Sequence, residues 1–237
     1  INVGSGPYQI SAPVSVNGEN FIYVANQGEA SVSVIRVKDN VVVATIPVGS
    51  EAYGLATLVR SGVTYVYVAN TNADTVSVIN TSSNSVIATV PVGVKPYYVA
   101  AAGSKIYVTN GQSNTVSVIN ANTNTLAATI TVGNYPRGIK AHGTDIYVAN
   151  YGDPNYGGGN TVSVIDTATD TVSETIRLPG TANGPRGMAV AGANVYTANY
   201  RSGTVSVINT ADNEVTATIA VGNGPRGLAV VGNNLYV

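Results

Sequence analysis

The sequence has 237 residues, of which 44% are hydrophobic and 10% are charged, and its formal net charge is −1. This charge balance argues against a general attraction to nucleic acid or to an anionic membrane. Because cysteine is absent and His142 is the single histidine, the sequence excludes disulfides and argues against a transition-metal site, so we expect no metal and no cofactor.

A tetrad close to Tyr-Val-Ala-Asn recurs along the chain and gives it a regular period. Its copies begin 44, 40, 40 and 49 residues apart, and Tyr236 begins a further copy 40 residues after the fifth. The five complete copies are Tyr23–Asn26, Tyr67–Asn70, Tyr107–Asn110, Tyr147–Asn150 and Tyr196–Asn199. A period near 40 residues without a helical pattern predicts a β-propeller, in which each repeat forms one blade.

The strands of one repeat can be assigned between residues 94 and 133. Short β-branched runs bounded by Asn, Gly and Ser are typical of strands joined by tight turns. They predict strands over residues 97–102, 105–110, 114–119 and 125–132. We therefore expect an all-β fold built from four-stranded antiparallel blades.

The number of blades stays open at this point. We expect five complete blades and a partial sixth over Gly224–Val237. The opening residues Ile1–Gly4 match the end of a fourth strand, so both termini could close a six-bladed ring, or the chain could be part of a seven-bladed propeller. Because the first residue is Ile rather than Met, we expect residues 1–237 to be a single domain from a longer chain. No run of 18 apolar residues is present, so no membrane span is predicted.

Two further motifs accompany the tetrads. They are TVSVIN at Thr75–Asn80, Thr115–Asn120 and Thr204–Asn209, and VGxxPxG at Val132–Gly138 and Val221–Gly227. With these motifs, the sequence resembles the YVTN-repeat propeller family over essentially its whole length. The resemblance implies a propeller in a secreted or cell-surface setting, as in archaeal surface-layer proteins, and it implies no particular ligand. A composition rich in Asn, Thr and Tyr and poor in Lys also favours an extracellular or cell-surface location, with the periplasm as an alternative.

Function is expected where the repeats differ, because folding explains the residues that they share. The residue after the Pro of VGxxPxG, or after Ala52 where Ala replaces the Pro, begins the innermost strand of each blade, and six such residues should surround one mouth of the central channel. They are Tyr8, Tyr53, Tyr97, Arg137, Arg186 and Arg226. Arg binds carboxylate, sulfate or phosphate and Tyr stacks on sugar rings, so all six are candidate ligand-binding residues. The alternative is that they fill the channel and hydrogen-bond neighbouring loops.

The fourth blade carries an insertion at Tyr151–Asn160, and a longer connection at Pro179–Gly184 follows on the same face. Tyr151, Asp153 and Tyr156 are further candidate ligand contacts, because a Gly-rich loop beside the Arg residues could form the edge of a binding site. One carboxylate falls short of a calcium ligand set, and a simple surface loop is the alternative.

Asn has two further roles in the interpretation of the repeat. The Asn that ends each tetrad precedes a turn, and we expect its amide to bond backbone groups of that turn. Asn80, in Asn80-Thr81-Ser82, begins the single N-glycosylation sequon and is a candidate glycosylation site.

The sequence favours a non-catalytic extracellular or cell-surface module that binds a protein or a glycan or serves as a scaffold, because no Ser–His–acid set is visible. The first alternative is a lactonase-type hydrolase, an activity found among distant relatives of the resembled family, with Glu51 as the candidate base and Glu29 or Asp74 as alternatives. The second is single-stranded nucleic acid binding through Tyr and Arg, which the net charge opposes.

Overall fold

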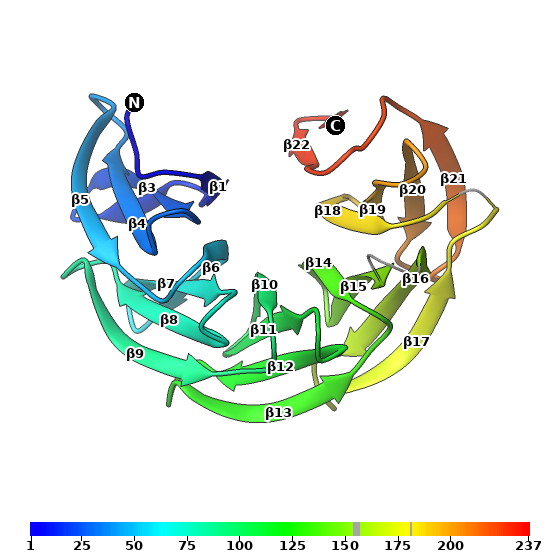
Figure 1. The fold of residues 1–237 in the computed structure, drawn as a ribbon, viewed down its shortest axis with the longest axis horizontal. Coiled ribbons are helices and arrows are strands. Elements are labelled where there is room, and N and C mark those ends of the chain that lie inside the picture. The colour runs from blue at the N-terminus through cyan, green and yellow to red at the C-terminus, as the bar shows by residue number, and fades with distance from the viewer. Residues whose placement is uncertain (154–156, 181) are drawn as a thin grey trace. The chain divides into compact units, whose positions relative to one another are not determined.

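The computed structural model describes residues 1–153, 157–180 and 182–237, which contain strands but no helix. These residues accordingly include no helix that could cross a membrane. Their strands form six sheets, and Figure 1 shows them coloured from blue to red in chain order.

Five of the sheets contain four or five strands that pair in chain order, and the sixth contains two. The first sheet has five strands because its innermost strand is split into β1 and β2, which both pair with β3. The strands of the first three sheets are β1 (Pro7–Ile10), β2 (Val14–Val16), β3 (Glu19–Asn26), β4 (Ser31–Arg36) and β5 (Val41–Pro47); β6 (Ala52–Arg60), β7 (Val63–Asn70), β8 (Thr75–Asn80) and β9 (Ser85–Pro91); and β10 (Pro96–Ala102), β11 (Lys105–Asn110), β12 (Thr115–Asn120) and β13 (Thr125–Thr131). The strands of the last three sheets are β14 (Pro136–His142), β15 (Asp145–Asp153), β16 (Gly157–Asp166) and β17 (Thr171–Arg177); β18 (Pro185–Ala191), β19 (Asn194–Asn199), β20 (Thr204–Asn209) and β21 (Val215–Ala220); and β22 (Ala229–Val231) and β23 (Asn234–Tyr236).

The strands predicted for the repeat at residues 94–133 are confirmed. The bounds of β10, β11, β12 and β13 agree with the predicted ranges to within one residue. The four-stranded blade is therefore the repeating element of the chain. Ile1–Gly4 lie outside any strand, and the closure of a sixth blade by both termini stays a prediction.

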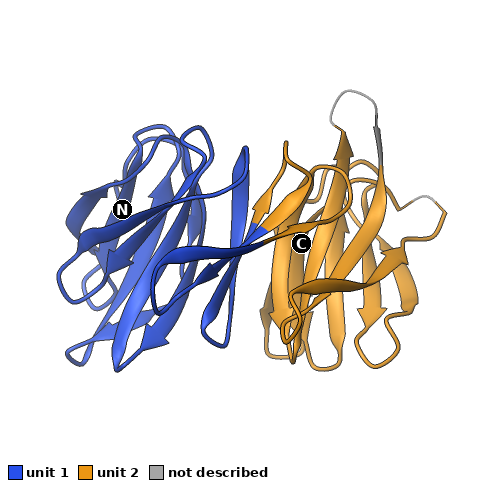
Figure 2. Cartoon of the chain, turned by 90° about the horizontal axis from the view of Figure 1, so that it is seen from below, with its two compact units in different colours: residues 1–108, 117–128 blue, residues 109–116, 129–237 orange. Residues whose placement is uncertain are grey.

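The chain divides into two compact units, shown in Figure 2: unit 1 contains residues 1–108 and 117–128, and unit 2 contains residues 109–116 and 129–237. Within each unit the core lies between neighbouring sheets. In unit 1, Val34 of β4 belongs to one buried cluster with Leu55 and Val66 of the next sheet. In unit 2, Val164 of β16 shares a buried cluster with Met188 of the next sheet. Apolar residues on both faces of a strand are thereby covered, as expected for stacked blades.

A recurring glycine fixes the spacing between neighbouring innermost strands. A β-carbon at Gly138 would lie 1.9 Å from the carbonyl oxygen of Arg186 in the next blade. A β-carbon at Gly187 would lie equally close, at 1.9 Å, to the carbonyl oxygen of Arg226. Only glycine permits such an approach of two backbones, so Gly138 and Gly187, which each follow Pro-Arg, determine how closely these blades stack.

The Tyr that begins the tetrad links a blade to the next one. The Tyr23 hydroxyl donates to Asn84 Oδ1 at 2.9 Å, and the Tyr147 hydroxyl donates to Asn213 Oδ1 at 2.7 Å. Both acceptors precede the fourth strand of the following blade and have left-handed φ angles of 47° and 58°. Both Tyr side chains are fully buried, and burial raises the pKa of each to about 12.

The prediction for the Asn that ends each tetrad is wrong. Its amide bonds hydroxyls of the third strand instead of the turn backbone: Asn70 Nδ2 donates to Thr75 Oγ1 at 3.0 Å and to Ser77 Oγ at 2.9 Å. Asn150 makes the same pair of bonds in the fourth blade. The reason is the register, because Asn70 lies directly opposite Thr75 in the pairing of β7 with β8 and is fully buried there. The Ser and Thr of TVSVIN are therefore the nearest partners of the tetrad Asn.

The fifth blade lacks part of the cover that the earlier blades receive. Ile219 of β21 is 47% exposed, whereas the equivalent Ile46 and Ile176 are 3% and 5% exposed. Tyr196, the equivalent of Tyr147, is half-buried. Within the described residues the following sheet has two strands, so it offers no connection to a fourth strand that could accept a bond from Tyr196.

The close approach at Gly187 predicts a large difference between two alanine substitutions. Gly187→Ala should lower the free energy of unfolding by about 1–3 kcal/mol, because the new methyl group forces the innermost strands apart. Gly227→Ala is the matched control: apart from Gly227 itself and its two neighbours in the chain, no described residue has an atom within 4 Å of the position of its β-carbon, and the effect should stay within about 0.5 kcal/mol. Urea unfolding of both variants measures the difference, and equal effects would contradict the assigned role of the glycine.

The pKa of Tyr147 predicts a loss of stability in alkali. Burial raises this pKa from 10.0 to about 12, so the unfolded chain releases the phenolic proton first. The stabilisation from neutral Tyr147 is complete below pH 10 and is lost as the pH rises from about 10 to about 12. The free energy of unfolding should therefore fall less steeply over this range in Tyr147→Phe than in the wild type, and parallel curves would sink the prediction.

The same variant tests the link between blades at neutral pH. Tyr147→Phe should lower the free energy of unfolding by about 1 kcal/mol, because it removes the hydrogen bond to Asn213. Tyr196→Phe, at the half-buried equivalent position, is the control and should change the free energy little.

Candidate functional site

A β-bulge near the start of the innermost strand orients the candidate side chains. In β14 the register shifts between Pro136 and Ile139, and Arg137 lies in this bulge. Arg186 and Tyr53 occupy the equivalent bulges of β18 and β6. A bulge interrupts the ladder and turns a side chain out of the regular alternation of the strand. The residue after the Pro is therefore presented by the backbone in the same way in several blades.

The connection before each bulge brings a second side chain to the same place. Tyr135 has a left-handed φ of 51°, and its N–H donates to Asn114 Oδ1 at 2.8 Å. Its carbonyl accepts the N–H of Tyr151 at 3.2 Å, and one blade later the Gly184 carbonyl accepts the N–H of Tyr200 at 2.9 Å. The residue after each tetrad therefore lies beside the residue before the Pro.

In unit 1 the three Tyr candidates pack on one another. The ring centroids of Tyr8 and Tyr53 are 3.7 Å apart, and those of Tyr53 and Tyr97 are 5.1 Å apart. Tyr98 adds a fourth ring 5.5 Å from Tyr53, and the hydroxyls of Tyr53 and Tyr98 both contact that of Tyr8. Tyr53 and Tyr97 are only 4% and 7% exposed, so this cluster agrees with the packing alternative more than with a surface on which sugars stack.

In unit 2 the Arg candidates lie among Tyr rings. The guanidinium carbons of Arg137 and Arg201 lie 5.2 Å and 4.4 Å from the ring centroid of Tyr151. Those of Arg186 and Arg226 lie 5.4 Å and 5.2 Å from the centroid of Tyr200. The two rings are 6.2 Å apart, so the contacts form one continuous group. We call this group the Arg–Tyr layer; its residues are Tyr135, Arg137, Tyr151, Arg186, Tyr200, Arg201 and Arg226.

The Arg–Tyr layer has buried and exposed members. Arg186 and Tyr151 are each 8% exposed and form its inner part. Arg226, which precedes β22 and belongs to no strand, is exposed, and Arg201 is half-buried. Arg201 Nη2 donates to the carbonyl oxygen of Asp153 at 2.9 Å, which fixes the end of this side chain. The layer therefore contains guanidinium groups that neighbouring residues restrain, and part of it can be reached from solvent.

The positive charge of the layer affects the ionisation of Tyr200. Arg226 Nη2 donates to the Tyr200 hydroxyl at 3.4 Å. This hydrogen bond, with the charges of Arg226 and Arg186, lowers the pKa of Tyr200 below its usual value. The phenolate is stabilised here by the same positive field that would attract an anionic ligand.

The insertion of the fourth blade is, where it is described, an extension of a hairpin. β15 and β16 continue to pair beyond the tetrad, with Gly152 opposite Gly158. Tyr151 thus belongs to a paired strand and to the Arg–Tyr layer, and Asp153 contributes its carbonyl oxygen to Arg201. Tyr156, the third candidate of the insertion, lies outside the described residues.

The candidate glycosylation site lies in unit 1. Asn80 ends β8, is half-buried, and accepts the N–H of Ser82 on its Oδ1 at 2.8 Å. Its modification stays a prediction.

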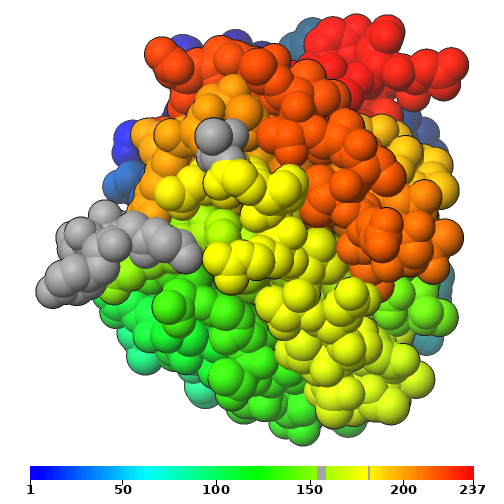
Figure 3. All heavy atoms as spheres, turned by 90° about the vertical axis from the view of Figure 1, so that its right-hand side faces the viewer, coloured from blue at the N-terminus to red at the C-terminus, as the bar shows by residue number. Residues whose placement is uncertain are grey.

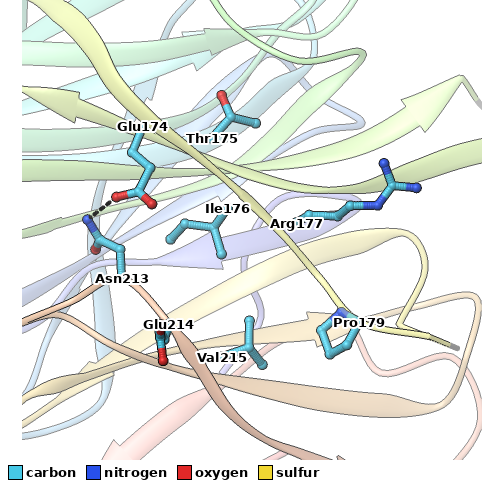
Figure 4. Close-up of a pocket in the computed structure, with 8 residues that line it drawn as sticks. All are labelled: Glu174, Thr175, Ile176, Arg177, Pro179, Asn213, Glu214 and Val215. Carbon is cyan, nitrogen blue, oxygen red and sulfur yellow. Dashed lines mark hydrogen bonds between the residues drawn. The ribbon is translucent and has the colours of Figure 1, made fainter.

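A cleft of about 350 Å³ lies between β17 and β21 in unit 2. Figure 3 views this outer side, with β17 in yellow and β21 in orange, and Figure 4 shows the residues that line the cleft. Asn213 Nδ2 donates to Glu174 at 2.9 Å, and Arg177 points away from this pair. Because Asn213 also accepts the bond from Tyr147, the cleft belongs to the contact that links two blades.

Several residues of these clusters were not anticipated from the sequence, namely Tyr98, Tyr135, Tyr200 and Arg201. The residue type at the position directly after the tetrad differs between the blades, and this variation could have indicated Tyr200. That position holds, in chain order, Gln27, Thr71, Gly111, Tyr151 and Tyr200.

The successive four-stranded antiparallel sheets define a β-propeller. Two solved structures are similar to this chain over most of its length. The virginiamycin B lyase from Staphylococcus aureus is 12% identical, with a TM-score of 0.76 over 94% of this chain and 74% of that one. Kuenenia stuttgartiensis hydrazine synthase is 16% identical, with a TM-score of 0.69 over 96% of this chain and 91% of that one. At these identities the similarity shows the fold alone. No family model and no curated protein matches the sequence.

The contact between Arg226 and Tyr200 predicts a change in titration. Arg226→Ala should raise the pKa of Tyr200 toward its usual value, because the variant loses the hydrogen bond and a nearby positive charge. Titration of the tyrosine ring carbons by NMR, with Tyr200→Phe for assignment, measures this pKa. Arg177→Ala, in the outer cleft, is the control and should leave the Tyr200 titration unchanged; an unaltered curve in Arg226→Ala would speak against the contact.

Proposed function

We propose that the chain is a non-catalytic binding module of the YVTN-repeat type, that it acts at the cell surface or outside the cell, and that the Arg–Tyr layer is its contact surface. The observation that carries the proposal is the set of four guanidinium groups around Tyr151 and Tyr200. Folding of the repeat does not require this set, because the equivalent positions of the first three blades hold other residue types.

The layer has the physical properties of a prepared binding surface. Contact with an aromatic face restricts each guanidinium group before any ligand arrives, so less conformational entropy is lost on binding. The planar fork of donors on each guanidinium group matches the geometry of an oxyanion. Exposed Arg226 and half-buried Arg201 make the layer accessible from solvent.

The chemistry of the layer favours binding over acid–base catalysis. Guanidinium groups stay protonated and cannot act as general bases. Of the seven carboxylates of unit 2, Asp153 lies at the strand ends that carry the layer. The others lie at the opposite strand ends or on the outer strand; they are Asp145, Asp166, Asp170, Glu174, Asp212 and Glu214. The resemblance of the repeat motifs to surface-layer and secreted propellers supports the proposed location.

A glycan array tests the proposed contact surface. The labelled wild type should bind one or more glycans, and the double variant Arg201→Ala/Arg226→Ala should lose most of that binding while it keeps the circular dichroism spectrum of the wild type. Arg177→Ala is the control for a change of charge away from the layer. Binding that survives the double variant but is lost in Arg177→Ala would assign the contact to the outer cleft and overturn the proposal.

A substrate screen tests the non-catalytic character. Lactones and sugar phosphates are offered to the wild type and to Glu51→Gln. We expect no turnover above buffer in either protein. Turnover that depends on Glu51 would establish the hydrolase alternative instead.

A further inference from the structure

Basic residues are unevenly distributed in unit 2. Four of its six Lys and Arg residues belong to the Arg–Tyr layer, and six of its seven Asp and Glu residues lie elsewhere. The chain as a whole carries a net charge of −1. The positive region is therefore local, and a ligand that it attracts must carry negative charge at closely spaced points.

The Tyr faces of the layer are already occupied by guanidinium groups. Tyr151 and Tyr200 each have two guanidinium carbons within 5.4 Å of the ring centroid. Stacking of nucleobases requires accessible aromatic faces, and Tyr151, which is 8% exposed, offers little of one. The N–H groups of exposed Arg226 and half-buried Arg201 are the donors closest to solvent, and guanidinium donors recognise oxyanions.

Access from solvent differs among the four guanidinium groups. Arg226 is exposed and Arg201 is half-buried, whereas Arg186 is only 8% exposed. The Nη1 atom of Arg201 is buried, and its Nη2 donates to the Asp153 carbonyl. A ligand would therefore meet Arg226 and the exposed part of Arg201 first.

The arginines form two centres, one at Tyr151 and one at Tyr200, whose rings are 6.2 Å apart on neighbouring blades. Two acidic groups on one chain can occupy both centres, and the second contact then forms at a high effective concentration. A polymer with repeated acidic groups fits this arrangement better than a single small anion.

We propose that the Arg–Tyr layer binds an acidic polysaccharide, with the carboxylate or sulfate groups of neighbouring sugars on the guanidinium groups of its two centres. This inference rests on the proposed function and names the class of ligand.

Titration calorimetry tests the ligand class with four probes: polygalacturonate for carboxylates, heparin for sulfates, neutral dextran, and inorganic sulfate alone. At least one acidic polymer should bind, more weakly as salt is added, and dextran should not bind. Inorganic sulfate should bind at least about tenfold more weakly per anion than the polymer, because it reaches one centre at a time. The preferred polymer identifies the acidic group. Absence of binding to both acidic polymers, or tighter binding of a poly-dT oligonucleotide, would overturn the inference.

Single substitutions then locate the interaction. Arg201→Ala and Arg226→Ala should each weaken binding of the acidic polymer about tenfold, the cost of losing one charge-assisted contact. Arg201→Lys keeps the charge but loses the fork, and it should recover only part of the affinity. Arg177→Ala should bind as the wild type does; an equal loss in this control would mean non-specific attraction and would refute the inference.

The glycan array separates the two proposals. If the layer variants lose binding to a neutral glycan while neither acidic polymer binds the wild type, the layer is a contact surface but its ligand is not acidic. If an acidic polymer binds and no layer variant affects it, both proposals fail.

Discussion

The contact on which the remaining structure depends is the approach of one innermost strand to the next at the glycine that follows Pro-Arg in the fourth and fifth blades. Carbonyl oxygens of Arg186 and Arg226 lie 1.9 Å from where β-carbons of Gly138 and Gly187 would be, so no larger residue fits there. This spacing lets the tetrad Tyr reach an Asn of the following blade. It also positions the backbone of the very arginines that form the candidate site, so packing and recognition share one constraint.

The regular parts of the fold could be predicted from the sequence because local chemistry determines them. β-Branched runs bounded by Asn and Gly define strands whatever the neighbouring blades do, and the predicted and observed strands of the third blade differ by at most one residue. The partner of the tetrad Asn could not be inferred in this way. Asn70 bonds Thr75 and Ser77 because of the strand register, and a sequence shows both motifs without showing that they lie opposite each other.

The sequence predicts the positions of three arginines of the candidate site but does not predict the aromatic rings that they contact. Arg137, Arg186 and Arg226 stand out because they replace Tyr at one place in the repeat. Their ring partners come from two other places, before the Pro and after the tetrad, and backbone bonds such as that from Tyr151 to Tyr135 make these places adjacent. The Tyr candidates of unit 1 follow from their place in the repeat, which leaves both ligand binding and packing open, and their contacts with one another depend on neighbouring strands that the sequence does not display.

The connection that precedes each innermost strand is held by its main chain. The N–H of Tyr135 is bound by Asn114, and its carbonyl is bound by the main chain of Tyr151, so neither bond involves the side chain of Tyr135 or of Tyr151. Where Tyr135 and Tyr151 stand, the first three blades carry quite different residues with the same main-chain path. A duplicated repeat thus keeps its backbone structure when its side chains at these positions change. A propeller of this kind can therefore acquire a new binding specificity one blade at a time while its fold stays the same.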